Sequence, residues 1–161
     1  MSDSTRVGFG VDAHRLTAGR PLILGGIEVP YERGLEGHSD ADVLTHAICD
    51  ALLGAACLGD IGVRFPDSDP AYEGISSLCL LEKVVCLLRE RGFRPVNVDT
   101  TVLAERPRLV PHFPAMRERL ARVLGLSSER VSLKATTTEA MGPVGRGEGI
   151  VAMATCLIET A

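Results

Sequence analysis

The stretch that decides the fold is HSDADVLTHAICDALLGAACL, residues 38–58. Its apolar residues recur every three or four positions and predict a helix over residues 41–58, with one stripe formed by Val43, Leu44, Ala47, Ile48, Ala51, Leu52 and Ala55. Ser39 is the expected N-cap, with Asp42 three residues later in the manner of a capping box. On the polar side of this helix, His46 lies four residues from both Asp42 and Asp50, so the three side chains should point the same way.

Two further helices and several short strands are expected outside this stretch. Helical spacing covers residues 76–91, which end at Gly92, and residues 114–124, which end at Gly125. Strand patterns occur at residues 7–11, 22–24, 27–29, 96–104, 131–137 and 150–158. Because helices and strands are mixed without strict alternation, we expect an α+β fold, a mixed β-sheet with helices packed on one face. No repeat or linker interrupts the pattern, so residues 1–161 should form one domain.

The composition excludes several classes of function. The 161 residues carry a formal net charge of −4 and only 4% aromatic residues, with no tryptophan. Neither a basic surface for nucleic acid nor a stacking platform for single strands is expected. The five cysteines form no C-x-x-C pair and indicate buried core thiols in a reducing compartment. No signal-peptide pattern is visible, and His46 and Asp50 interrupt the longest apolar run, so we expect a cytoplasmic protein without a membrane span.

Asp12, His14 and His46 offer one carboxylate and two imidazoles. Asp12 and His14 lie two apart in an extended run, so a strand would place both side chains on the same face. If His46 approaches them, three protein ligands leave a fourth position open, which distinguishes catalytic from structural zinc. Asp42 or Asp50 would then hold the imidazole nitrogen of His46 that does not face the metal. A structural Asp–His pair with unrelated histidines is the alternative.

Two segments are candidates for binding phosphate. His38 and Ser39 precede the first helix, whose free N–H groups favour an anion at its start; simple capping by Ser39 is compatible with this. In residues 134–149, three threonines lead from a strand into a glycine-rich turn that contains Glu139. Hydroxyl and N–H groups there suit phosphate oxygens, and Glu139 suits a hard cation such as Mg²⁺. An edge strand followed by a flexible turn is the alternative for this segment.

Two loops that contain prolines complete the candidates. FPDSDP, residues 65–70, is a rigid turn with two carboxylates, and AERPRLVP, residues 104–111, leaves a strand with exposed backbone groups. The backbone of the second loop suits a nucleobase. An ordinary turn and a basic surface loop are the alternatives for these two segments. His112, at the helix entrance that follows, is expected on the surface.

Taken in order, these motifs resemble one family, 2-C-methyl-D-erythritol 2,4-cyclodiphosphate synthase of the non-mevalonate isoprenoid pathway. The matching segments are RVGFGVDAH (6–14), the run 38–46, LLGAA (52–56), GDIG (59–62), FPDSD (65–69), KATTTE (134–139) and GRGEG (145–149), which extend over essentially the whole chain. The resemblance implies a homotrimer with active sites between neighbouring subunits. It also implies a phosphorus–oxygen lyase that converts 4-diphosphocytidyl-2-C-methyl-D-erythritol 2-phosphate to 2-C-methyl-D-erythritol 2,4-cyclodiphosphate and CMP, and that binds neither nucleic acid nor membranes.

The resemblance also assigns roles to the candidate residues. Zinc, or another divalent transition metal, would be bound by Asp12, His14 and His46. Mg²⁺ or Mn²⁺ would be bound by Glu139 between the substrate phosphates, and His38 and Thr137 would stabilise the transition state. The implied substrate contacts are Asp12, Ala13, His14, His38, Ser39, Asp60, Ile61, Gly62, Phe65, Pro66, Asp67, Ser68, Asp69, Ala104, Glu105, Arg106, Pro107, Arg108, Leu109, Val110, Thr136, Thr137, Thr138, Glu139, Pro143 and Arg146.

Three positions depart from the usual pattern of that family. Pro143 stands where phenylalanine is common, Met153 where an acidic residue is common, and Arg108 where lysine is common. By the resemblance, the first two would lie near the trimer axis, where isoprenoid diphosphates would bind, so they put that axial ligand site in question. Arg108 keeps the positive charge expected to contact phosphate.

Two other functions remain open from the sequence. A metal-dependent phosphohydrolase would use Asp12, His14 and His46 to activate water and would yield no cyclic diphosphate. A non-catalytic nucleotide-binding trimer would hold structural zinc with the same residues, and loss of His46 would unfold it. Three ligands without a fourth cysteine or histidine argue against the structural-zinc alternative. The resemblance makes the cyclising synthase the leading hypothesis.

Overall fold

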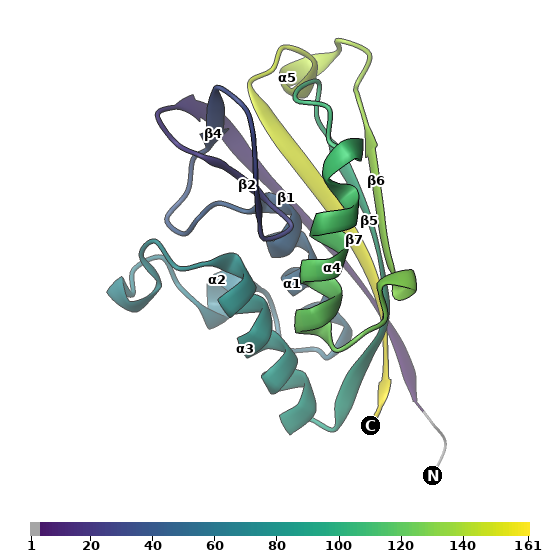
Figure 1. The fold of residues 1–161 in the computed structure, drawn as a ribbon. Helices are drawn as coiled ribbons and strands as arrows, with labels where there is room; N and C mark the ends of the chain where they lie inside the picture. The colour runs from purple at the N-terminus through teal and green to yellow at the C-terminus, as the bar shows by residue number, and fades with distance from the viewer. Residues whose placement is uncertain (1–3) are drawn as a thin grey trace.

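A five-stranded mixed sheet of order β4-β1-β7-β5-β6 forms one layer of the computed structural model, which describes residues 4–161 (Figure 1). Strands β5 and β6 are parallel, and the other neighbouring pairs are antiparallel. A separate antiparallel pair consists of β2 and β3. The strands are β1 (Thr5–Ala18), β2 (Leu22–Leu24), β3 (Ile27–Val29), β4 (Arg33–Leu35), β5 (Phe93–Leu103), β6 (Val131–Thr136) and β7 (Gly149–Thr160).

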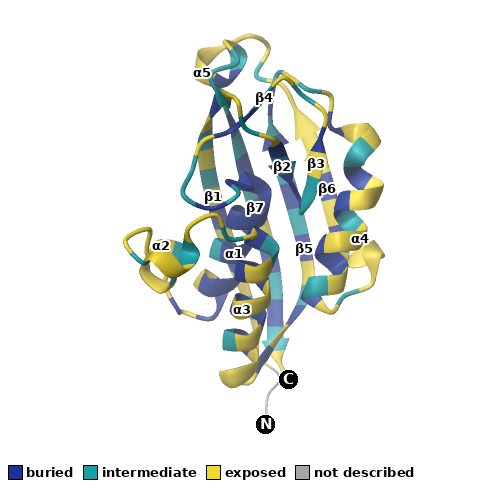
Figure 2. Cartoon of the chain, turned by 60° about the vertical axis from the view of Figure 1, so that its left-hand side comes forward, coloured by how far each residue is buried: buried dark blue, intermediate teal, exposed yellow. Residues whose placement is uncertain are grey.

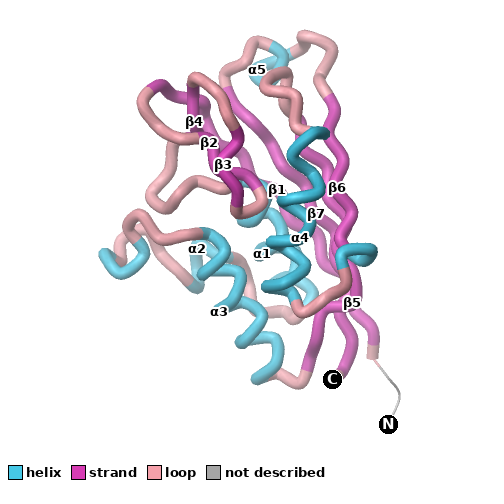
Figure 3. Tube along the Cα trace, viewed as in Figure 1, coloured by secondary structure: helices cyan, strands magenta, loops and turns pink. Residues whose placement is uncertain are grey.

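The three long helices lie on the same side of this sheet (Figure 3). Helix α1 packs directly against β1 and β7, and α3 packs on α1 and α4. Buried residues fill the space between the helices and the strands (Figure 2). The α-helices are α1 (Val43–Ala55), α2 (Ile61–Arg64), α3 (Ser77–Glu90), α4 (Phe113–Leu124) and α5 (Gly142–Gly145), with 3₁₀ turns at Pro70–Tyr72, Val110–His112 and Ser128–Arg130. The prediction of an α+β fold with helices on one face is confirmed.

The start of α1 differs from its prediction. Its N-cap is Asp42, whose carboxylate accepts hydrogen bonds from the backbone N–H of Thr45 (3.0 Å) and from the Thr45 hydroxyl (2.7 Å). The same carboxylate accepts from the N–H groups of Gly25 (3.0 Å) and Gly26 (2.8 Å), which form the turn between β2 and β3. Ser39 is therefore not the cap. Its hydroxyl accepts instead from the N–H of Ala41.

Helix α1 is buried on nearly every side, which the amphipathic interpretation did not predict. His46 is 6% exposed and Asp42 is completely buried, so neither lies on a solvated polar face. Complete burial raises the pKa of the Asp42 carboxyl above its ordinary value, even though the hydrogen bonds from Thr45 and Gly26 act in the opposite direction. The helix is enclosed because β1 and β7 cover one side of it, and α3 and the β2–β3 pair cover the other sides.

Two glycines on β1 allow α1 to approach the sheet closely. A Cβ atom at Gly8 would overlap the carbonyl oxygen of Ala51, and one at Gly10 would overlap the carbonyl oxygen of Ala47. The even-numbered residues of this part of β1 therefore face α1, and side chains at 12 and 14 continue the same face. This close contact brings the metal-ligand candidates of β1 within reach of α1.

Substituting Gly10 with alanine is expected to destabilise the fold by about 3 kcal/mol, because the overlapping atoms belong to backbone and cannot rotate away. The measurement is the free energy of unfolding in denaturant. Gly54→Ala is the matched control: its Cβ would lie 4.0 Å from the nearest heavy atom, and replacing a helical glycine should stabilise by up to about 1 kcal/mol. Equal stability of the Gly10 variant and the wild type would contradict this account of the interface.

Several local predictions were incomplete or wrong. Strand β1 extends well beyond residues 7–11, and the short elements β4, α2 and α5 were not predicted. Of the five cysteines, Cys49 and Cys156 are buried as expected, whereas Cys57, Cys79 and Cys86 are exposed. The last two lie seven apart on the outer side of α3, because the buried stripe of that helix runs through Leu80, Leu81, Val84, Val85 and Leu88. All five are free thiols, and burial raises the pKa of Cys156 to about 11.

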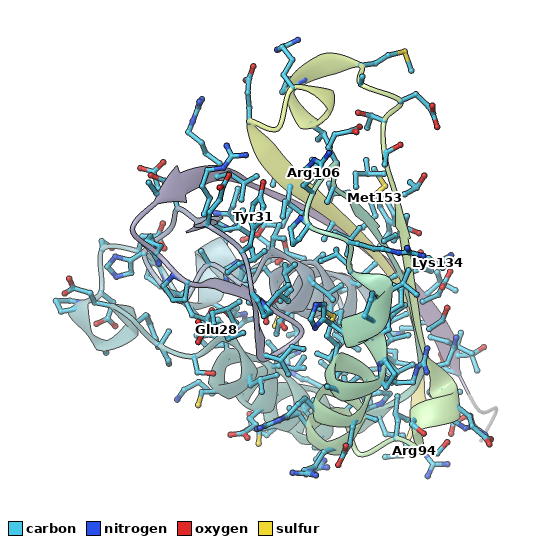
Figure 4. All side chains as sticks on the ribbon, turned by 45° about the horizontal axis from the view of Figure 1, so that its top comes forward. Glu28, Tyr31, Arg94, Arg106, Lys134 and Met153 are labelled. Atoms are coloured by element: carbon cyan, nitrogen blue, oxygen red, sulfur yellow. The ribbon has the colours of Figure 1, made fainter. Side chains whose placement is uncertain are left out.

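The sheet face opposite the helices carries exposed apolar side chains. Val7, Phe9 and Val11 of β1 are 69%, 62% and 46% exposed. Met153 of β7 pairs in register with Val11, and Figure 4 marks it together with Lys134 of β6. This open face lacks a covering layer within residues 4–161. In the same part of the chain, none of the helices combines the length and apolar character needed to cross a membrane.

Candidate metal centre

Asp12, His14 and His46 come together where β1 meets α1. Oδ2 of Asp12 lies 2.9 Å from Nε2 of His14 and 3.0 Å from Nδ1 of His46, and the two ring nitrogens are 3.3 Å apart. A tetrahedral ion with bonds of roughly 2.0–2.2 Å needs ligand atoms roughly 3.3 Å apart. The predicted group therefore has the donor atoms and nearly the spacing that a divalent metal requires.

The electrostatics of the group favour a cation. Burial alone would raise the pKa of Asp12, but hydrogen bonds from His14 and His46 outweigh it and hold the pKa of this carboxyl well below its usual range. Burial alone would lower the pKa of His14, but the bond to Asp12 outweighs it and raises that pKa. Asp12 is thus a carboxylate at neutral pH, and both rings point a nitrogen at its negative charge.

Each histidine has a partner for its second ring nitrogen. Nδ1 of His14 lies 2.7 Å from the carbonyl oxygen of Glu36, so the neutral ring keeps its proton on Nδ1, and its Nε2, which in the protonated ring donates to Asp12, then offers a lone pair to a metal. Nε2 of His46 lies 2.8 Å from the hydroxyl oxygen of Ser77 and 3.2 Å from that of Ser39. Oδ2 of Asp12, Nε2 of His14 and Nδ1 of His46 form the donor triangle. Both rings are therefore oriented by groups outside the donor triangle.

The expectation that Asp42 or Asp50 holds the ring of His46 is wrong. The Asp42 carboxylate is occupied by α1 and the β2–β3 turn, as described above, and Asp50 accepts from the backbone N–H of Ile61 (2.8 Å). Sequence spacing indicated neither Ser77 nor Glu36, because both reach the centre through tertiary contacts with other elements.

A cavity of about 210 Å³ opens beside the triangle. His38 and Ser39 line it together with Phe65 and Asp67 from the proline-rich turn. Ile61 and Gly62 of α2 line the same cavity, as do four residues that the sequence did not indicate: Gly37, Tyr72, Ile75 and Leu80. The ring of Tyr72 stacks edge-on against Phe65 with centroids 5.4 Å apart. Asp60, Pro66, Ser68 and Asp69 do not line it; the carboxylate of Asp60 caps α2 instead.

The predicted nucleobase loop forms a different cavity. Residues 104–110 line a space of about 320 Å³ together with Ala135, Thr136 and Thr137 at the end of β6. The N–H of Ala104 donates to the carbonyl of Thr136, which holds the two segments together. This cavity shares no lining residue with the cavity at the metal centre, so His38 lines one of these two cavities and Thr137 lines the other.

The comparisons with known proteins agree with this arrangement. The family model described as the YgbB family matches residues 5–159. The chain belongs to the YgbB family. A 2-C-methyl-D-erythritol 2,4-cyclodiphosphate synthase from Symbiobacterium thermophilum is 64% identical over 152 residues, which are 94% of this chain and 97% of that protein. One from Syntrophomonas wolfei is 61% identical over 97% of this chain and 99% of its own length.

Solved structures related to this YgbB-family chain share its fold. A 2C-methyl-D-erythritol-2,4-cyclodiphosphate synthase in a form bound to CDP superposes with a TM-score of 0.88 at 38% identity, over 95% of this chain and 99% of that one. A bifunctional IspDF from Campylobacter jejuni gives a TM-score of 0.96 at 39% identity over 99% of this chain. The chain spans 43% of the length of that bifunctional protein.

Glu139, the predicted ligand of a second cation, lies outside the donor triangle. It is exposed, on a tight turn in which Glu139 and Ala140 both have positive φ angles (52° and 61°). Glu105 holds this turn: its Oε1 accepts from the N–H groups of Thr138 (3.0 Å) and Ala140 (3.3 Å). The Glu105 side chain, expected to contact substrate, is therefore occupied in fixing the neighbouring loop of this YgbB-family chain.

Replacing Glu105 with alanine is expected to lower turnover by about 10- to 100-fold while zinc content stays at the wild-type level. The reason is positional: without the acceptor, the turn that carries Glu139 loses three of its hydrogen bonds, those from the N–H and hydroxyl of Thr138 and from the N–H of Ala140. Small displacements of groups in a site have effects of this size. Steady-state kinetics and metal analysis provide the readouts. Glu105→Gln retains an acceptor oxygen and should keep most of the activity; if it is as defective as the alanine variant, the negative charge and not the acceptor matters.

The positions that depart from the family's usual pattern lie at one end of the molecule and on the open face. Pro143, the second residue of α5, lines a hollow of the surface together with Ala13 and His14. Arg146 pairs with Glu148 at 2.7 Å. Arg146 also lines a separate cavity with Tyr31 and Arg106, both labelled in Figure 4.

Proposed function

We propose that the chain, with residues 1–161 acting as one domain, converts 4-diphosphocytidyl-2-C-methyl-D-erythritol 2-phosphate to 2-C-methyl-D-erythritol 2,4-cyclodiphosphate and CMP. The observation that carries the proposal is the Asp12–His14–His46 triangle beside a cavity lined by His38 and Ser39. A triangle with three ligands leaves a coordination position for a substrate oxygen. Membership of the YgbB family and relatives named for this synthase activity at 64% and 61% identity support the same conclusion.

The reaction needs no nucleophile from the protein. An oxygen of the substrate's own 2-phosphate attacks the β-phosphorus, the bond from that phosphorus to the bridging oxygen breaks, and CMP leaves with the electron pair. The 2-phosphate is largely dianionic near neutral pH, because its second pKa is about 6. The protein therefore contributes positioning and charge neutralisation, which dominate phosphoryl transfer.

The residues of the metal centre suit these two tasks. Asp12, His14 and His46 would hold zinc or another divalent transition metal, which when bound supplies Lewis-acid stabilisation of charge on the β-phosphate. His38, on the wall of the same cavity, would stabilise the transition state together with Thr137. Glu139 would hold Mg²⁺ or Mn²⁺ between the α- and β-phosphates, since hard cations take carboxylate and phosphate oxygens.

We infer a homotrimer with active sites between subunits from two features. The metal centre and the nucleobase loop occupy separate cavities of one chain, so a neighbour would supply the second half of each site. Val7, Phe9 and Val11 form an exposed apolar strip on the open face of the sheet, which packing against further copies would bury. Five free thiols without a disulfide suit the reducing cytoplasm, where we place the reaction.

The test is to incubate the purified protein, with zinc and Mg²⁺, with the cytidyl substrate and to follow the products by ³¹P NMR. Cyclic diphosphate and CMP are expected, no turnover after treatment with a chelator, and recovery on adding zinc. Open-chain phosphates would support a hydrolase instead. Intact substrate with fully zinc-loaded protein would withdraw the proposed reaction and leave the family and the fold unaffected.

A further inference from the structure

The ring of His46 is oriented by a buried network that the proposed chemistry does not use directly. Its Nε2 faces two hydroxyl groups, those of Ser77 (2.8 Å) and Ser39 (3.2 Å), while Nδ1 points to Asp12. The two serines differ in their surroundings. Ser77 is completely buried at the start of α3, whereas Ser39 lines the cavity.

Asp40 determines how the Ser77 hydroxyl is used. Its Oδ1 accepts a hydrogen bond from the Ser77 hydroxyl, and its Oδ2 accepts from the backbone N–H of Ser77 (3.0 Å). An ionised carboxylate has no proton to donate, so the Ser77 hydroxyl must donate to Asp40. The remaining lone pairs of the Ser77 oxygen then face Nε2 of His46, which must therefore carry a proton.

This order of donors fixes the tautomer of His46. A neutral imidazole has one N–H group, and placing it at Nε2 leaves the lone pair of Nδ1 free to face a metal. His14 has the opposite arrangement, with its proton on Nδ1 and its lone pair on Nε2. The two ligands thus present different ring nitrogens, and each is fixed by an acceptor on the far side of its ring.

The network is anchored on both sides of the cavity. The N–H of Asp42 donates to Asp40 (3.2 Å), and the N–H of Asp40 donates to the carbonyl of Ile75 (3.1 Å). The N–H of Gly74 donates to the carbonyl of His38 (2.9 Å). These hydrogen bonds join the segment before α1 to the segment before α3. Asp40 therefore holds both Ile75, which lines the cavity, and Ser77, which contacts the metal ligand His46.

We propose that Ser77, held by Asp40, is a positioning residue whose hydroxyl oxygen accepts a hydrogen bond from the Nε2–H of His46 and so directs Nδ1 at the metal, leaving the Ser39 hydroxyl for the substrate. This inference rests on the metal binding in the proposed function. It assigns Ser77 no contact with substrate.

The first test compares zinc affinities, measured by competition with a chromogenic chelator. Ser77→Ala should bind zinc about 10- to 100-fold more weakly than the wild type, the usual effect of losing a partner of a metal-binding histidine. Ser76→Ala, the neighbouring exposed serine, is the matched control and should bind like the wild type. Asp40→Asn should also weaken binding, because the amide can donate to the Ser77 oxygen and reverse the order of donors.

A second test needs no variant. In ¹⁵N-correlated spectra of the zinc-loaded wild type, which has four histidines, His46 should be protonated at Nε2 and His14 at Nδ1. A His46 protonated at Nδ1, or a Ser77→Ala variant that is folded and binds zinc as tightly as the wild type, would overturn the inference. A wild type that does not bind zinc at all would instead overturn the proposed function, so the two failures are distinguishable.

Discussion

Replacing His46 with alanine is expected to abolish zinc binding at the centre and to lower kcat/KM by roughly 10³-fold or more. A bound cation contributes several kcal/mol of charge stabilisation to phosphoryl transfer, and each 1.4 kcal/mol corresponds to a factor of ten in rate. His46 supplies one of three donor atoms, and the remaining pair, Asp12 and His14, makes a weaker site. Metal analysis of the purified variant and the ³¹P assay measure the two effects.

The same variant separates a catalytic from a structural metal. Because His46 sits on an α1 that is already packed between the sheet and α3, we expect a folded protein that is moderately destabilised by the cavity left behind. His112→Ala is the matched control, since this half-buried histidine at the start of α4 makes no side-chain cap bond. An unfolded His46 variant beside a normal His112 variant would support a structural metal and contradict the catalytic assignment.

The sequence predicts best those features that depend on residues close together in the chain, such as the alternation of side chains along a strand or the glycine that ends a helix. Asp12 and His14 share a face because alternate side chains of a strand do so, and the ends of α3 and α4 follow from Gly92 and Gly125, which adopt positive φ angles. The meeting of His46 with this pair is not a local property. It was predicted from the chemistry of the three residue types, and the structure brings them within hydrogen-bonding distance.

The parts that the sequence could not predict depend on tertiary contacts. The burial of α1 on nearly every side cannot be seen in its periodicity, since an amphipathic helix and a largely enclosed one differ only in what covers the second face. Ser77 reaches His46 across 31 positions of sequence, whereas Asp42, four positions away, turns to the β2–β3 turn. Spacing on the helix therefore indicated the wrong partner, because a buried polar group bonds to whichever donor or acceptor the fold places beside it.

Replacing Glu139 with glutamine is expected to lower turnover by roughly 10²-fold while leaving zinc content near the wild-type value. The substitution keeps the size of the side chain and removes the charge that would hold a hard cation between the substrate phosphates. Glu139 is not a member of the donor triangle, so the three candidate metal ligands are untouched. The variant should need a higher Mg²⁺ concentration for half-maximal rate, which a titration of Mg²⁺ at fixed zinc would measure.

The control for this change is Glu129→Gln, which removes the same charge from an exposed position in the 3₁₀ turn before β6 and should leave the Mg²⁺ titration unaltered. Two results would argue against separate cation sites. Loss of zinc in the Glu139 variant would mean that this carboxylate belongs to the zinc site, reached from a neighbouring subunit. An unchanged Mg²⁺ requirement at reduced turnover would mean that Glu139 acts on the substrate directly, since a cation ligand must affect the concentration at which the cation binds.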